Sequence, residues 1–193
     1  MVYTEDEHHR AVPRGLFHGW GPDGFRHALQ QAAALSSTLH IITLDAPLSA
    51  VVQHLPLMYD EVWTAGKGSY KLQRPGVVAP GGEIILHAPH IHCFHSKPAL
   101  DAAIRAIGYR GRAHALEWMR RFPAFDRNVA AHVINVRGTG EDFKVTLATA
   151  IPREECEAVG LGWRDPATLR REDFAEPGRL WIEEGGQWLY ARR

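Results

Sequence analysis

The chain has 193 residues, of which 45% are hydrophobic and 23% charged, as is ordinary for a folded globular protein. Lysine and arginine together number 22, as do aspartate and glutamate, so the formal net charge is zero. This balance argues against a partner such as a nucleic acid or a membrane surface. The polar N-terminus lacks a secretion signal, and no apolar run approaches the roughly 20 residues that span a bilayer. The composition therefore predicts a cytoplasmic protein.

For the first part of the chain, the sequence predicts an irregular start at 1–14, followed by alternating helices and strands. A proline in its first turn begins a helix over 21–35, whose apolar residues recur at helical spacing. The elements that follow are a strand at 39–44, a short helical turn at 50–55 and a strand at 61–65.

The second part continues this alternation. Its predicted elements are a strand at 83–88, helices at 96–107 and 113–122, strands at 132–136 and 143–150, a helix from residue 152, one or two turns at 166–174, and a closing hairpin of 180–183 with 187–190. Strands that alternate with helices predict an α/β domain with a central mixed, mostly parallel sheet flanked by helices. We expect one such domain at 16–193, after a lead-in at 1–15.

The most informative stretch is 59–91, YDEVWTAGKGSYKLQRPGVVAPGGEIILHAPHI. Lys67, Ser69, Tyr70 and Lys71 lie in a glycine-flanked loop after a predicted strand, where a rigid sheet presents polar groups to ligands. Two lysines, a phenol and a hydroxyl are suited to an anionic substrate. The glycine spacing matches neither a phosphate-binding loop nor a dinucleotide fingerprint. A surface loop with solvated lysines is the alternative.

Four histidines lie within nine positions, at His87, His90, His92 and His95. His90 and His92 share one face if the strand continues, and His95 could fold back as a third metal ligand. The alternative is a set of surface histidines, because Pro89 disfavours an extended strand at this point.

A second anion-binding candidate is the turn Arg137-Gly138-Thr139-Gly140. It could present a guanidinium group and backbone N–H groups to a carboxylate or a phosphate. An ordinary hairpin turn, with glycine at a positive φ, is the alternative.

Several of these strings resemble the C-terminal domain of the nickel-dependent lactate racemase family. The resemblance rests on YDEVWTAGKGSYKLQ and APGGEIILHAPHI, with the looser segments RGTG, TLATAIP and GLGW, and runs from about Leu16 to the C-terminus. It implies a two-domain isomerase with its active site between the domains. The N-terminal domain of the family holds the nickel-pincer nucleotide and the catalytic histidines, and the C-terminal domain closes over a 2-hydroxy acid.

The resemblance assigns a role only to the loop residues. Lys71 corresponds to the substrate-binding lysine, with Lys67 as a second candidate and Tyr70 and Ser69 as hydrogen-bonding neighbours. The shorter loop leaves the identity of the hydroxy acid open. The cofactor lysine, the nickel ligand and the catalytic histidines of the family belong to a domain that this chain does not contain. We therefore expect no catalytic residue, no bound cofactor and no activity in this chain alone, which would need the N-terminal domain in cis or in trans.

Two other hypotheses stay open at this stage. The histidine cluster could form a self-contained metal protein, for example a hydrolase. Alternatively, Lys67, Lys71 and Arg137 could bind an anion in a module that has no catalytic role.

Overall fold

The structure, a computed structural model, describes residues 1–138 and 142–193. The chain divides into two compact units, Met1–Ile42 and Thr43–Arg193. This division does not test the domain boundary expected after residue 15, which stays a prediction. Among the described residues, no helix combines the length and the apolar character that crossing a membrane requires.

The first unit consists of a hairpin and a long helix. Strands β1 (Val2–Glu5) and β2 (Ala11–Gly15) pair antiparallel, so the irregular start predicted for 1–14 is wrong. Helix α1 (Gly21–His40) begins with a proline in its first turn, as predicted. It continues past residue 35 because neither glycine nor proline follows to stop it.

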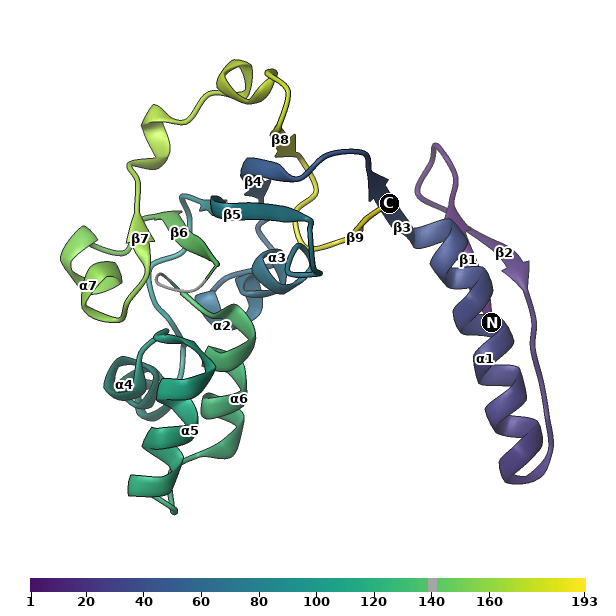
Figure 1. The fold of residues 1–193 in the computed structure, drawn as a ribbon, viewed down its shortest axis with the longest axis horizontal. Coiled ribbons are helices and arrows are strands. Elements are labelled where there is room, and N and C mark those ends of the chain that lie inside the picture. Colours follow the sequence, from purple (N-terminus) through teal and green to yellow (C-terminus); the bar gives the residue numbers. More distant parts are fainter. Residues whose placement is uncertain (139–141) are drawn as a thin grey trace. The chain divides into compact units, whose positions relative to one another are not determined.

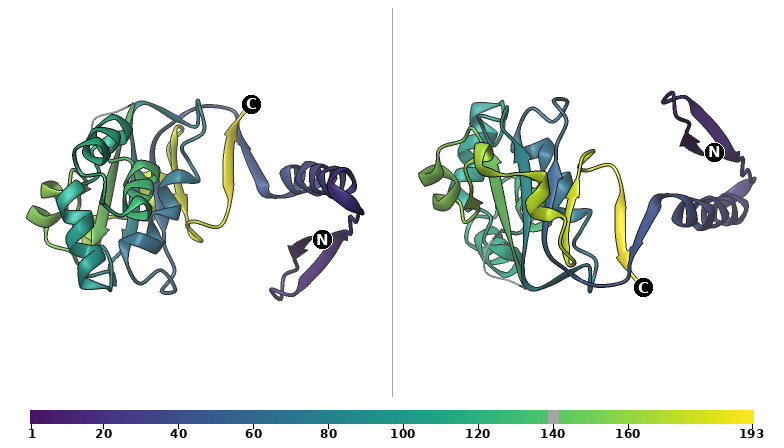
Figure 2. Two further views of the ribbon diagram at one scale, coloured as in Figure 1. Left: turned by 90° about the horizontal axis from the view of Figure 1, so that it is seen from below. Right: turned by 90° about the horizontal axis from the view of Figure 1, so that it is seen from above.

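The second unit is built on a five-stranded sheet with the order β7-β6-β5-β4-β8. Its strands are β4 (Leu48–His54), β5 (Val78–Ala88), β6 (Phe143–Thr149), β7 (Gly162–Trp163) and β8 (Arg179–Ile182). Every pairing between the described residues of this sheet is parallel. Figure 2 shows β8 beside β4, although the two strands are far apart in the sequence. The predicted α/β class is confirmed.

Both faces of this sheet are covered, and the side chains of its central strands alternate between two clusters. Val51 and Ile84 point into the larger cluster, under the helices of one face, whereas Val52 and Ile85 pack against Phe174 on the other. The helices are α2 (Val62–Ala65), α3 (Lys67–Tyr70), α4 (Pro98–Ile107), α5 (Gly111–Arg121), α6 (Arg127–Val136) and α7 (Arg153–Ala158), with short 3-10 turns η1 (Pro166–Thr168) and η2 (Arg171–Phe174) (Figure 1). Because both faces of the sheet are buried, its central strands consist of continuous apolar runs.

Three predicted elements have the wrong type. The strand at 61–65 is α2, the strand at 132–136 is the end of α6, and the helical turn at 50–55 is β4. Short apolar runs do not distinguish a buried helix from a buried strand. The start of α6 has a local cause, because the side chain of Asp126 accepts hydrogen bonds from the amides of Asn128 and Val129.

The predicted C-terminal hairpin is also wrong. β8 pairs with β4 in the main sheet, and β9 (Leu189–Arg192) pairs with β3 (Ile41–Leu44) in a separate two-stranded sheet. Gly185 and Gly186 do not turn β8 back on itself. The amide of Gly185 donates to the carbonyl oxygen of His54, at the end of β4. The expected antiparallel component is therefore missing from the described part of the five-stranded sheet.

Candidate functional site

Residues 59–77, which we call the lysine segment, connect the carboxyl end of β4 to the amino end of β5. They form α2 and α3 and not the predicted strand and loop. A Cβ atom on Gly66 would lie 2.5 Å from Val136, and one on Gly68 would lie 2.8 Å from Leu86. These glycines therefore let α3 pack closely against α6 and β5, and they do not form a phosphate cradle.

Lys67 and Lys71 lie one helical turn apart, on the same side of α3. The Nζ atom of Lys67 is 5.7 Å from the centre of the Tyr59 ring, and the Nζ atom of Lys71 donates to the carbonyl oxygen of Gln187 at 3.2 Å. Burial lowers the pKa of Lys71, and the positive charge of Lys67 lowers it further. Neither lysine has a carboxylate partner among the described residues. The two ammonium groups are thus close enough for the charge of one to affect the pKa of the other.

Tyr70 and Ser69, the predicted neighbours of these lysines, have different environments. The ring of Tyr70 is 40% exposed, and burial, with the charge of Tyr59, raises the pKa of its hydroxyl group. Ser69 is fully buried, donates to the carbonyl oxygen of Val136 at 2.9 Å and accepts from the side chain of Gln73 at 2.6 Å. Tyr70 is accessible to a ligand, whereas the hydroxyl group of Ser69 holds α3 against the end of α6.

Arg137 follows the last residue of α6 and has a φ of 69°. Its guanidinium group lies 5.6 Å from the centre of the Phe143 ring. It lines a cavity that includes Tyr70 but neither Lys67 nor Lys71. Thr139 and Gly140 of the predicted turn lie outside the described residues.

The three histidines proposed as metal ligands lie in different surroundings. The Nε2 atom of His90 lies 2.8 Å from the carbonyl oxygen of Tyr59, His92 is exposed, and the Nδ1 atom of His95 lies 3.2 Å from the carboxylate of Glu61. In the described part of the chain, no three or more His, Cys, Asp or Glu side chains are grouped so that they could hold a metal ion. The structure therefore gives no support to a metal site at His90, His92 and His95.

The fourth histidine of the cluster belongs to a pair that the sequence pattern did not indicate. His54 and His87 are register partners near the carboxyl ends of the neighbouring strands β4 and β5, and their Nδ1 atoms are 2.8 Å apart. Trp181 of β8 packs on both rings. Burial lowers the pKa of His87, and the charge of His54 adds to this effect. To predict from the sequence that these two histidines are neighbours, one would need to know the register of the parallel strands β4 and β5.

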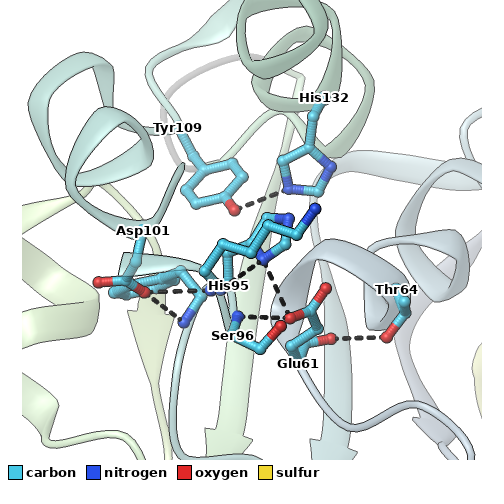
Figure 3. A network of polar contacts seen from close by, with 9 residues as sticks. Glu61, Thr64, His95, Ser96, Asp101, Tyr109 and His132 are labelled. Carbon is cyan, nitrogen blue, oxygen red and sulfur yellow. Dashed lines mark hydrogen bonds and ion pairs between the residues drawn. The ribbon is translucent and has the colours of Figure 1, made fainter. Parts of the chain in front are cut away.

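A polar network that includes Glu61, the residue before α2, anchors the lysine segment (Figure 3). The carboxylate of Glu61 contacts His95 and accepts from the amide of Ser96, and the hydroxyl group of Tyr109 lies 2.8 Å from the Nε2 atom of His132. The ring of Trp63 packs against both imidazoles, at 5.1 Å from His95 and 4.4 Å from His132. These contacts join α2 to the loop before α4 and to α6. The network thus fixes the start of the lysine segment.

The whole chain aligns with a crystal structure of a protein from Thermotoga maritima, with 49% sequence identity and a TM-score of 0.88, and covers 48% of that chain. It also aligns with the lactate racemase apoprotein from Thermoanaerobacterium thermosaccharolyticum, with 12% identity and a TM-score of 0.57, over 85% of this chain and 40% of that chain. The chain has a lactate racemase-like fold. It spans about half the length of the first protein and less of the second. Neither a scan against models of protein families nor a search of curated proteins gave a match.

Proposed function

We propose that this chain is the substrate-closing part of a racemase or epimerase of 2-hydroxy acids. The observation that carries the proposal is the pair of ammonium groups of Lys67 and Lys71, which lie on a lactate racemase-like fold and have no carboxylate partner within residues 1–138 and 142–193. In this proposal the two cations bind the carboxylate of a hydroxy acid, and Tyr70, a 40% exposed residue of the same helix, donates a hydrogen bond to the substrate. Closure against a second domain would exclude water and strengthen this attraction.

In the proposed enzyme a nickel-pincer nucleotide held by another domain would supply the redox chemistry. The described residues do not fit a nickel site, because no suitable group of ligands is assembled among them. We assign no cofactor-dependent step to this chain. Its role in the proposal is to bind the carboxylate, to orient the substrate and to exclude water, while a cofactor-bearing domain acts in cis or in trans.

Complementation tests this division of roles. The chain alone should not racemise lactate or other 2-hydroxy acids, and addition of a matching cofactor-loaded domain should produce turnover, measured by chiral chromatography. Lys71→Ala should then raise KM at least about tenfold, the equivalent of about 1.4 kcal/mol of binding energy. Lys97→Ala is the matched control, because Lys97 is exposed at the start of α4. Racemisation by the chain alone, or an unchanged KM in a Lys67→Ala, Lys71→Ala double variant, would refute the proposal.

A further inference from the structure

The first unit leaves most of its large apolar side chains on its surface. In residues 1–42, all of which the structure describes, Val2 and Ala28 are the only buried hydrophobic residues. Yet this unit includes the 20-residue helix α1 (Figure 1). A helix in a protein is stabilised mainly by packing of its apolar face, and units of about 40 residues usually require a cross-link, a metal or a partner. The first unit by itself therefore lacks the burial that a stable helix requires.

The contacts within the first unit fix the two ends of α1. At its C-terminal end, the Nε2 atom of His40 lies 2.8 Å from a carbonyl oxygen of β1. A Cβ atom on Gly15, the last residue of β2, would lie 2.7 Å from the side chain of Leu35. At the start of α1, a Cβ atom on Gly19 would overlap the carbonyl oxygen of Gly24, so the preceding segment lies directly against the helix. The surface between these contacts is therefore held in one shape.

This surface contains an open cavity of about 410 Å³, which we call the α1 cavity. Phe25, Ala28, Leu29 and Ala32 line it from the helix, at the spacing of a single helical face. Trp20 lines it from the segment before the helix. Trp20 is 90% exposed, Phe25 65% and Leu29 55%, and the first unit by itself leaves them at least this exposed, because a neighbour can only cover them further. The α1 cavity is thus a preformed apolar surface.

We propose that the α1 cavity is the docking site of a further folded domain, of the kind that the longer Thermotoga maritima protein carries. That protein aligns with the whole of this chain, residues 1–42 included, and this chain covers 48% of it. It therefore contains about as much polypeptide again, enough for a second domain. A large apolar side chain of that domain, placed between Trp20 and Leu29, would bury the surface that the first unit leaves open.

The surroundings of the α1 cavity suit a contact between two folded domains. Asp23 and Arg26, in the first turns of α1, form an ion pair at 3.7 Å with each other. An apolar centre beside polar and charged residues is the usual composition of such an interface. The proposal does not rest on the racemase role, because it concerns the first unit and is measured by protection of α1 and not by turnover.

Amide hydrogen exchange tests the proposal on the full chain, alone and in a fusion. In the fusion, this chain replaces the aligned part of the Thermotoga maritima protein, so the rest of that protein stays covalently attached. The amides of α1 should exchange about 100-fold more slowly in the fusion than in the chain alone, because docking raises the free energy of local opening. The amides of α4, in the second unit, should exchange equally in both proteins, which shows that the chain is folded in each.

Substitutions in the α1 cavity identify the docking surface. Leu29→Gln and Phe25→Gln should each speed the exchange of α1 about tenfold in the fusion, as expected for the loss of one buried apolar side chain, and should change nothing in the chain alone. Glutamine is a good helix former, so neither change breaks the helix. Leu116→Gln is the matched control, because it replaces another exposed leucine in a helix, α5, and should leave the exchange of α1 unchanged in both proteins.

Two outcomes would overturn the proposal. The first is equal exchange of the α1 amides in the fusion and in the chain alone. The second is protection of α1 that is already complete in the chain alone and is lost in Leu29→Gln, because the α1 cavity is then covered without a further domain. Light scattering identifies the cover in that case: a dimeric mass indicates a second copy of the chain, and a monomeric mass indicates the second unit of the same chain.

Discussion

A fall in pH from about 7 to about 4 should destabilise the second unit through His132, a neutral histidine in its interior. The Nε2 atom of His132 lies 2.8 Å from the hydroxyl group of the fully buried Tyr109, and its ring stacks on Trp63. Burial lowers the pKa of His132 to about 4, and the charge of His95 contributes in the same direction. An imidazolium at this position would be desolvated, and none of the described carboxylates pairs with it.

The direction and the size of the effect follow from linkage between protonation and folding. The ordinary pKa of histidine is 6.5, so the unfolded chain takes up the proton first as the pH falls. The stability contributed by the neutral form is complete above about pH 6.5. It is lost between that pH and about 4, below which both states are protonated. At 1.36 kcal/mol per pKa unit, the difference amounts to about 3 kcal/mol across this window.

Urea unfolding at a series of pH values, followed by tryptophan fluorescence, measures this loss. His132→Gln keeps a polar group near Tyr109 but cannot titrate, so the difference in unfolding free energy between wild type and variant should change by about 3 kcal/mol from pH 7 to pH 4. His114→Gln is the matched control, because it removes a half-buried histidine from the neighbouring helix α5. If the wild-type and His132→Gln stabilities run parallel over this range, the reasoning is wrong.

Three other changes test the packing around the lysine segment and the amino end of β5. Gly68→Ala should lower the free energy of unfolding in urea by about 1–3 kcal/mol, because the added methyl group would approach Leu86 to 2.8 Å. An unchanged unfolding midpoint would contradict close packing of α3 on the sheet. Glu61→Ala should lower the free energy of unfolding by about 3 kcal/mol because it leaves buried hydrogen-bond donors unpaired, and Glu61→Gln should lower it by less. Equal losses for the two variants would contradict this explanation. Burial alone would raise the pKa of Glu83, but hydrogen bonds from Thr146, Arg164 and Lys144 outweigh it and lower the pKa. The stability that the Glu83 carboxylate contributes is present at neutral pH and is lost as the pH falls below 4.5. Glu83→Gln should therefore lower the free energy of unfolding by about 2 kcal/mol at pH 7 and by progressively less in acid. A loss of stability that does not depend on pH would refute this assignment.

The sequence predicted a helix best where the spacing of apolar residues agreed with the residues that typically begin and end helices. Helix α4 was predicted at 96–107 from Pro98 near its start, its apolar face and Gly108 at its end, and the structure places Pro98 in its first turn and Gly108 after its last residue, with a positive φ. The α/β class followed from the alternation of apolar strands with such helices. The lysine segment was singled out from its residue types, and its role in ligand binding stays a prediction, whereas its secondary structure was predicted wrongly.

The predictions failed where the outcome depends on a distant partner. The run Val62–Ala65 is a helix, and the glycines that follow it, Gly66 and Gly68, pack closely against α6 and β5, which are distant in the sequence. The buried state of Ser69 depends on Val136 in the same way. Strand β8 pairs with β4, which is far away in the sequence, and the local hairpin that was predicted at Gly185 does not form.

By itself, the sequence determined which charges, turns and apolar stripes are available, because these properties are local and follow from residue type and spacing. Only the tertiary structure decided which of them meet. Lys71 lies beside Gln187, Arg74 beside Arg112 and Arg137 at one cavity, and His54 beside His87, because the packing of helices on a parallel sheet joins distant segments. Ligand-binding geometry depends on such non-local contacts, whose free energy comes from burial over the whole domain and not from any one motif.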